Sequence, residues 1–177
     1  LYDQAAFETM LADDNVDVIV WGVCGYPNAL RQPQMFGWIK ADNGQISSIS
    51  VKTPLESPAT DPIVLGTFTF RHAEDFRCAV ARLVARDGQI NGEFYIDSCI
   101  NDAIELGLQC KLFEVDSYLC WGTPNDLRTF EYWQSCFHKW VDQPYRLELD
   151  SRVPKDQISS LNKRYRATLP NRPGSRV

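Results

Sequence analysis

The order of apolar and polar positions predicts alternating helices and strands over the first 140 residues. Phe7, Met10 and Leu11 recur at helical spacing, and the turn-forming residues 13–15 end that helix. The run from Val16 to Val23 is mostly apolar and rich in β-branched residues. Such a run is typical of a strand that is covered on both faces, so we expect a central strand here.

The next stretch contains loops and further strands. Residues 25–33 hold two prolines and a glycine, which predicts a loop that borders a site. Residues 36–52 predict two strands joined at Asn43-Gly44, because both turn residues tolerate positive φ. After a proline-bearing loop, residues 63–70 predict another strand, whose interior Gly66 leaves room for a ligand to approach the backbone.

Three helices and one more strand complete this part of the chain. Residues 74–86 form an amphipathic pattern that ends at Gly88, and a shorter helix stops at Gly107. Residues 110–115 predict a strand. Alternating strands and helices indicate an α/β fold in which helices cover a mixed sheet.

The third helix has the clearest start signal. Thr123 is the predicted N-cap, Pro124 fits the first turn, and Asp126 completes a T-x-x-D capping box. We expect one apolar face of this helix to pack in the core, namely Leu127, Phe130, Trp133, Phe137 and Trp140.

Composition excludes several classes of protein. With 177 residues, 44% hydrophobic and 12% aromatic, the chain can bury one core, which excludes disordered and collagen-like chains. Its longest apolar run, residues 18–21, is far shorter than the roughly 20 residues of a membrane span. A net charge of −5 argues against nucleic-acid binding. No secretory signal is readable, so we expect a cytoplasmic protein.

Charge and cysteine positions refine this picture. Residues 1–140 carry 10 basic and 19 acidic side chains, whereas residues 141–177 carry 8 and 4. We therefore expect one domain over residues 1–140 and a basic, solvated extension over residues 141–177.

The six cysteines form no C-x-x-C pair, and the chain has two histidines. We expect reduced thiols and no metal cluster.

Four places combine polar residues or glycine with the end of an apolar strand: Phe36-Gly37, Lys52, residues 91–95 with Glu93, and residues 118–124 with Trp121. Ligands collect at strand ends in open α/β sheets, so one shared pocket is expected. The Glu93 carboxylate suits a diol and the Lys52 ammonium suits a phosphate. Alternatively, Glu93 holds a loop or a helix end, and Lys52 is a solvated edge-strand lysine.

These motifs, in this order and together with residues 121–127, resemble the C-terminal two-thirds of bacterial sugar-phosphate nucleotidyltransferases. Glucose-1-phosphate thymidylyl- and uridylyltransferase-like enzymes are the nearest type, and the resemblance covers roughly residues 1–135. It implies a Rossmann-like, glycosyltransferase-A-like mixed sheet flanked by helices and incomplete at its N-terminus. Because the chain begins at Leu1, we expect a further segment upstream.

The resemblance also implies roles for single residues. Gly37 would lie against the sugar, Lys52 would bind the sugar phosphate, and Glu93 would bind sugar hydroxyls. Gly66 and Trp121 are expected to belong to the same substrate-binding site.

The sequence departs from the family pattern at several points. It lacks the G-x-G-x-R loop and the first Mg²⁺-binding aspartate of the family, Val51 replaces a glutamate, and Cys120 replaces a second metal aspartate. A thiol is a poor ligand for Mg²⁺, so the Mg²⁺ ligand is expected upstream of this chain.

The resulting hypothesis is the sugar-binding portion of an enzyme that converts a nucleoside triphosphate and a sugar 1-phosphate to a nucleotide sugar and pyrophosphate. We expect the chain alone to be catalytically incomplete. Without the nucleotide-binding half, Val16–Val23 would be uncovered, so we expect a homo-oligomer. The alternatives are a non-catalytic sugar-phosphate-binding or assembly module and a related glycosyltransferase.

Overall fold

The computed structural model describes residues 2–140 and residue 156. The chain divides into two compact units, Leu1–Tyr118 and Leu119–Val177, which we describe separately. The expected extension over residues 141–177 lies outside the described residues, apart from residue 156.

The first unit is built on one five-stranded sheet. Its order is β1-β4-β2-β3-β5, and a short contact that pairs Gln45 with Lys111 closes β3 onto β5. Only β1 and β5 run parallel, and every other neighbouring pair is antiparallel. The strands are β1 (Val18–Val23), β2 (Gly37–Asp42), β3 (Gln45–Val51), β4 (Ile63–Phe70) and β5 (Cys110–Glu114). The expected mixed sheet is confirmed, but a small closed sheet with one parallel pair is not a clear Rossmann-like sheet.

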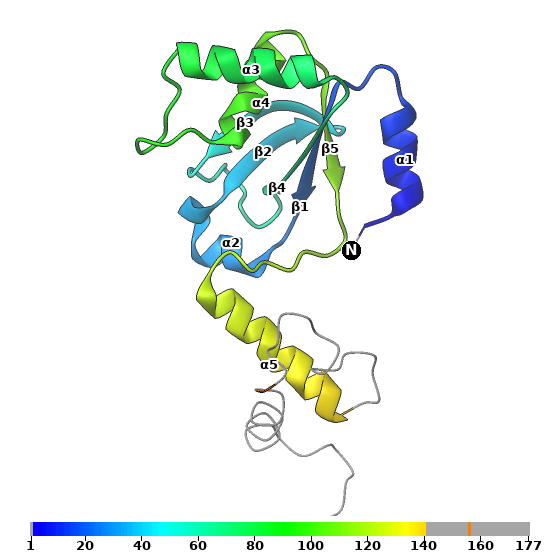
Figure 1. Cartoon of the computed structure of the whole chain (residues 1–177), viewed down its shortest axis with the longest axis vertical. Helices are drawn as coiled ribbons and strands as arrows, with labels where there is room; N and C mark the ends of the chain where they lie inside the picture. The colour runs from blue at the N-terminus through cyan, green and yellow to red at the C-terminus, as the bar shows by residue number, and fades with distance from the viewer. Residues whose placement is uncertain (1, 141–155, 157–177) are drawn as a thin grey trace, which may run out of the picture. The chain divides into compact units, whose positions relative to one another are not determined.

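Helices cover this sheet on two sides. Figure 1 shows α3 and α4 together over the sheet, with α1 lying beside β5. The helices of the unit are α1 (Gln4–Ala12), α2 (Pro27–Arg31), α3 (Ala73–Ala85) and α4 (Ile96–Glu105), with a 3-10 turn at Pro33–Met35. The prediction of a loop over residues 25–33 is wrong, because Pro27 and Pro33 each occupy a first helical turn, where a missing N–H costs nothing.

The hairpin signal is confirmed. Asn43 and Gly44 join β2 to β3 and have φ values of 48° and 77°. Both residues accept the left-handed conformation that a two-residue hairpin turn requires. The register then shifts between Lys40 and Ala41, and beyond this irregularity Gly37 pairs with Val51 at the far end of the hairpin.

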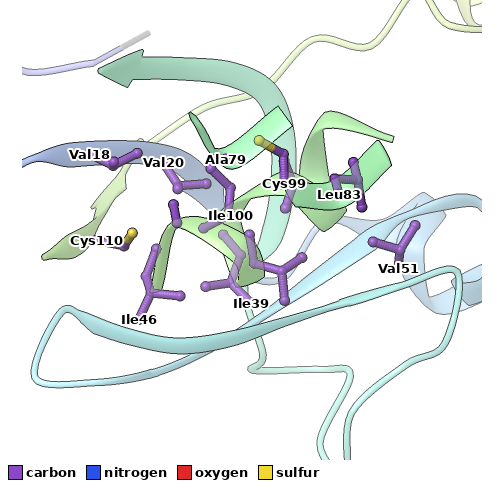
Figure 2. Packing of buried hydrophobic residues seen from close by; sticks show 13 residues of the cluster. Val18, Val20, Ile39, Ile46, Val51, Ala79, Leu83, Cys99, Ile100 and Cys110 are labelled. Carbon is purple, nitrogen blue, oxygen red and sulfur yellow. The ribbon is translucent and has the colours of Figure 1, made fainter. Parts of the chain in front are cut away.

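Two apolar clusters fill the two faces of the sheet. Val18 and Val20 of β1 belong to the cluster between the sheet and helices α3 and α4, part of which is drawn in Figure 2. Ile19 and Val23 belong to the other cluster, which Phe7 of α1 helps to cover. Val18, Ile19 and Val20 are at most 2% exposed, so the prediction of a strand covered on both faces is confirmed. The expectation that this strand would be uncovered is wrong, because α1, α3 and α4 of the same chain supply the cover.

The second unit is described as far as helix α5 (Pro124–Trp140). Its start is the predicted capping box: the Asp126 amide donates to Thr123 Oγ1 at 3.2 Å, and the Thr123 amide donates to Asp126 Oδ2 at 3.1 Å. The prediction that the apolar face of this helix packs in the core is wrong for three of its residues, since Leu127, Trp133 and Phe137 are exposed. The side chain of Trp140 lies outside the described residues.

All six cysteines lie among the described residues and are free. Among the described residues, no helix combines the length and the apolar character needed to span a membrane.

Candidate functional site

The site begins where the β2–β3 hairpin ends. Lys52 follows β3 with φ of 62°, and its amide donates to Phe36 O at 3.0 Å. This left-handed conformation costs a residue with a Cβ about 1–2 kcal/mol, so surrounding contacts must hold it. The ammonium supplies one such contact, because Lys52 Nζ donates to Met35 O at 3.1 Å. The side chain is thereby held beside the residues that precede Gly37.

A second turn brings Glu93 and Tyr95 to the same end of the sheet. Ile90 and Glu93 exchange two backbone hydrogen bonds across Asn91-Gly92, whose φ values of 53° and 79° fit the tight turn that this dipeptide favours. The Tyr95 hydroxyl donates to Glu93 Oε2. Lys52 Nζ lies 5.3 Å from the centroid of the Tyr95 ring, within the range of a cation–π contact.

Helix α4 adds a carboxylate that the sequence analysis did not single out. Asp97 stands in the first turn of this helix, where the positive end of the helix dipole favours negative charge. A Cβ built on Gly37 would lie 2.3 Å from Asp97 Oδ2, so the carboxylate occupies the space that any larger residue at position 37 would need. Gly37, Lys52, Tyr95 and Asp97 therefore meet at one end of the β2–β3 pair.

The electrostatics of this group follow from burial and hydrogen bonding. Burial raises the pKa of Asp97, while its own backbone amide and the charge of Lys52 oppose that rise. The hydrogen bond to Glu93 raises the pKa of Tyr95, so the phenol stays protonated at neutral pH. The site thus presents one ammonium, one half-buried carboxylate and one phenol whose hydroxyl is already engaged.

Gly66 and Trp121 are the two remaining predicted site residues. Gly66 has φ of 78° and stands in β4 where the register with β1 shifts, and a Cβ there would meet nothing within 4 Å. A bulge therefore accounts for this glycine without a ligand. Trp121 belongs to the second unit and packs against Phe130 with ring centroids 4.9 Å apart.

A separate pocket of about 310 Å³ lies beside Ile49 and Val51 of β3. None of the five predicted site residues lines it. Its walls are Ile49, Val51, Ser98, Asn101 and residues 86–90. We place the candidate site at Lys52 and Asp97 rather than in this pocket, because the guanidinium of Arg86 in the pocket wall is already paired with the Asp102 carboxylate.

The described residues offer no fit for Mg²⁺. Among them, no group of three or more histidine, cysteine, aspartate or glutamate side chains is arranged to hold a metal ion. Cys120, the residue in place of a metal aspartate, has its Sγ 3.3 Å from the Gly122 amide that donates to it. A soft thiol engaged in this way is a poor ligand for a hard cation. We therefore assign no step of any reaction to a metal bound by these residues.

Two solved structures resemble this chain. One is the nucleoside-diphosphate-sugar pyrophosphorylase from Vibrio cholerae RC9, with a TM-score of 0.55 and 18% identity over 73% of this chain and 49% of that chain. The other is CMP:2-keto-3-deoxy-manno-octonic acid synthetase complexed with CTP, with a TM-score of 0.50 and 14% identity over 75% of this chain and 54% of that chain. The similarity shows a shared α/β fold, and this chain spans about half the length of each structure.

Sequence comparisons add no closer relationship. No protein-family model matches the sequence, and no curated protein matches it.

Proposed function

We propose that Leu1–Tyr118 is the sugar-phosphate-binding part of a nucleotidyltransferase that forms a nucleotide sugar. The observation that carries the proposal is the meeting of Gly37, Lys52 and Asp97 at the end of the hairpin. A phosphate needs a cation and sugar hydroxyls need an acceptor, while Gly37 leaves the space that the Asp97 carboxylate occupies. The fold shared with two proteins named for nucleotide-sugar chemistry supports the same proposal.

In the reaction we propose, a phosphate oxygen of the sugar 1-phosphate attacks the α-phosphorus of a nucleoside triphosphate. The bond from that phosphorus to the β-phosphate oxygen breaks, and pyrophosphate leaves. The task of Lys52 is to bind and orient the attacking phosphate, since such reactions are catalysed by positioning and charge stabilisation. The family pattern includes Mg²⁺ and a nucleotide-binding segment upstream, which a longer protein would have to supply.

A binding experiment tests this function. In calorimetry with glucose 1-phosphate, Lys52→Met should weaken binding by about 1.5–3 kcal/mol, the value of a hydrogen bond to a charged group. Lys40→Met is the matched control, because Lys40 is exposed on β2. Equal affinities of the two variants would remove Lys52 from the site and with it the main support for the proposal.

Assays of turnover separate the proposal from its alternative. A non-catalytic sugar-phosphate-binding module would bind glucose 1-phosphate but would never release pyrophosphate, even when the upstream segment of a longer protein is supplied. A nucleotidyltransferase would release pyrophosphate from a matching nucleoside triphosphate under the same conditions.

We further propose that the protein is cytoplasmic, since its free cysteines fit a reducing compartment. Light scattering would measure whether it forms the predicted homo-oligomer.

A further inference from the structure

The Asp97 carboxylate lies directly against the backbone of Gly37. A Cβ on Gly37 would approach Asp97 Oδ2 to 2.3 Å and Cγ to 3.2 Å. Gly37 pairs with Val51, the residue before Lys52. The carboxylate therefore stands beside both strand ends and close enough to Lys52 to feel its charge.

The oxygens of Asp97 have unused acceptor capacity. An ionised carboxylate offers about four acceptor positions. Within residues 2–140, no other side chain donates a hydrogen bond to Asp97 or forms an ion pair with it, and its own backbone amide is the hydrogen-bonding group that acts on it. A half-buried carboxylate with open lone pairs is costly unless a donor from solvent or a ligand fills them.

Glu93 differs from Asp97 both in its burial and in the hydrogen bonds that its carboxylate accepts. Its side chain is exposed, and its Oε2 already accepts the Tyr95 hydroxyl. That hydroxyl bond fixes Tyr95 next to Lys52, which makes Glu93 a positioning residue for the aromatic ring.

We propose that Asp97, rather than Glu93, is the carboxylate that accepts hydrogen bonds from the hydroxyls of a bound sugar phosphate. This inference rests on the proposed function and makes it more specific. Lys52 binds the phosphate group, and Asp97 accepts hydrogen bonds from hydroxyls of the sugar ring that carries this phosphate. Gly37 has no side chain because its Cβ would displace the carboxylate. The ligand class is a phosphorylated sugar whose free hydroxyls and phosphate can reach both groups at once.

Calorimetry on the 177-residue chain with two probes tests the assignment. Glucose 1-phosphate carries hydroxyls and a phosphate, whereas inorganic phosphate carries no sugar hydroxyl. Asp97→Asn should weaken glucose 1-phosphate binding by about 10- to 100-fold and leave phosphate binding nearly unchanged. Glu93→Gln tests the competing carboxylate and should change glucose 1-phosphate binding by less than about threefold, because the glutamine side chain can still accept the Tyr95 hydroxyl.

A second variant leaves Asp97 in the chain. Gly37→Ala should displace the carboxylate and reproduce the selective loss of glucose 1-phosphate affinity. If Asp97→Asn does not fold, this variant decides the test: retained glucose 1-phosphate affinity overturns the inference.

Other results overturn the inference in distinguishable ways. If Lys52→Met loses affinity for both probes while Asp97→Asn loses none, the proposed function stands and the role of Asp97 is wrong. Equal weakening of both probes by Asp97→Asn would show that it acts only through the charge of Lys52. If the unmodified chain binds neither probe, the proposed function fails and the inference fails with it.

Discussion

The guanidinium of Arg86 donates two parallel hydrogen bonds to the carboxylate of Asp102. The Nε to Oδ1 distance is 2.7 Å and the Nη2 to Oδ2 distance is 2.8 Å. Asp102 on α4 is 1% exposed, whereas Arg86 is about half exposed at the end of α3. Arg82 Nε lies 3.6 Å from the same carboxylate. The pair thereby ties α3 to α4, the helix that also presents Asp97.

Removing Arg86 should destabilise the fold. Arg86→Met leaves the buried Asp102 with only the more distant Arg82, and we expect the free energy of unfolding to fall by about 2–4 kcal/mol. Arg77→Met is the matched control, because Arg77 pairs with exposed Glu74 on the same helix and should cost at most about 1 kcal/mol. Urea denaturation measures both values. Equal losses would show that the buried position of Asp102 does not decide the cost.

The amide of Asn101 closes the outer edge of β3. Its Oδ1 accepts from the Ile49 amide at 2.7 Å, and its Nδ2 donates to Ile49 O at 2.8 Å. Asn101→Ala should lower the free energy of unfolding by about 1–3 kcal/mol, because two backbone groups lose their partners. Gln89→Ala removes an exposed amide and should change it by less than about 0.5 kcal/mol. Unchanged stability of Asn101→Ala would mean that water replaces the amide without cost.

The capping box of α5 gives a prediction for the second unit. Thr123→Ala removes the hydroxyl that accepts from the Asp126 amide and should cost about 1 kcal/mol. Thr129→Ala, inside the same helix, should be neutral or slightly stabilising, because alanine is the better helix former. Helicity from circular dichroism and the denaturation midpoint should fall for the first variant only. A fall in both would point to a general loss of packing instead.

Much of the fold could be predicted because its signals are local. Asn43-Gly44 specifies a two-residue turn, and Thr123 with Asp126 specifies a helix start, whatever the rest of the chain does. The loop expected over residues 25–33 was wrong because proline serves equally well in a loop and in a first helical turn. Strand order could not be predicted, since the sequence pattern of β1 does not reveal that β4 and β5 are its neighbours.

The candidate site was predictable only in part. Lys52 directly follows a predicted strand and Glu93 directly follows the Asn91-Gly92 turn, both of which can be found in the sequence. The structure brings the two residues together through Tyr95. Asp97 gave one weak signal, an acidic residue in the first turn of a helix, which usually serves the helix dipole alone. Its contact with Gly37 joins residues 60 positions apart and depends on how α4 packs on β3, so no local pattern reports it.

The pH dependence of stability should reveal the unusual environment of Asp97. Burial raises its folded-state pKa above the ordinary value, so the folded chain favours the protonated carboxyl. As pH rises from below the ordinary value through the folded-state pKa, the native chain loses stability at this group. The asparagine of Asp97→Asn does not ionise, so the variant does not lose this stability as the pH rises. It should therefore be more stable than the unmodified chain at neutral pH. This difference should shrink as the pH falls from the raised folded-state pKa to below the ordinary pKa of an aspartate.

Asp13→Asn is the matched control with the opposite sign. The backbone amide of Asn15, followed by its side-chain amide, lowers the pKa of Asp13, so ionised Asp13 stabilises the fold above its ordinary pKa. That stability is lost as pH falls through the lowered folded-state value, and the variant should therefore be the less stable chain at neutral pH. Thermal denaturation from pH 3 to pH 7 measures both differences against the unmodified chain. A gain for Asp97→Asn that grows toward acidic pH would mean that Lys52 outweighs burial, and Asp97 would then be an ordinary ion-pair partner rather than a carboxylate held open for hydroxyl donors.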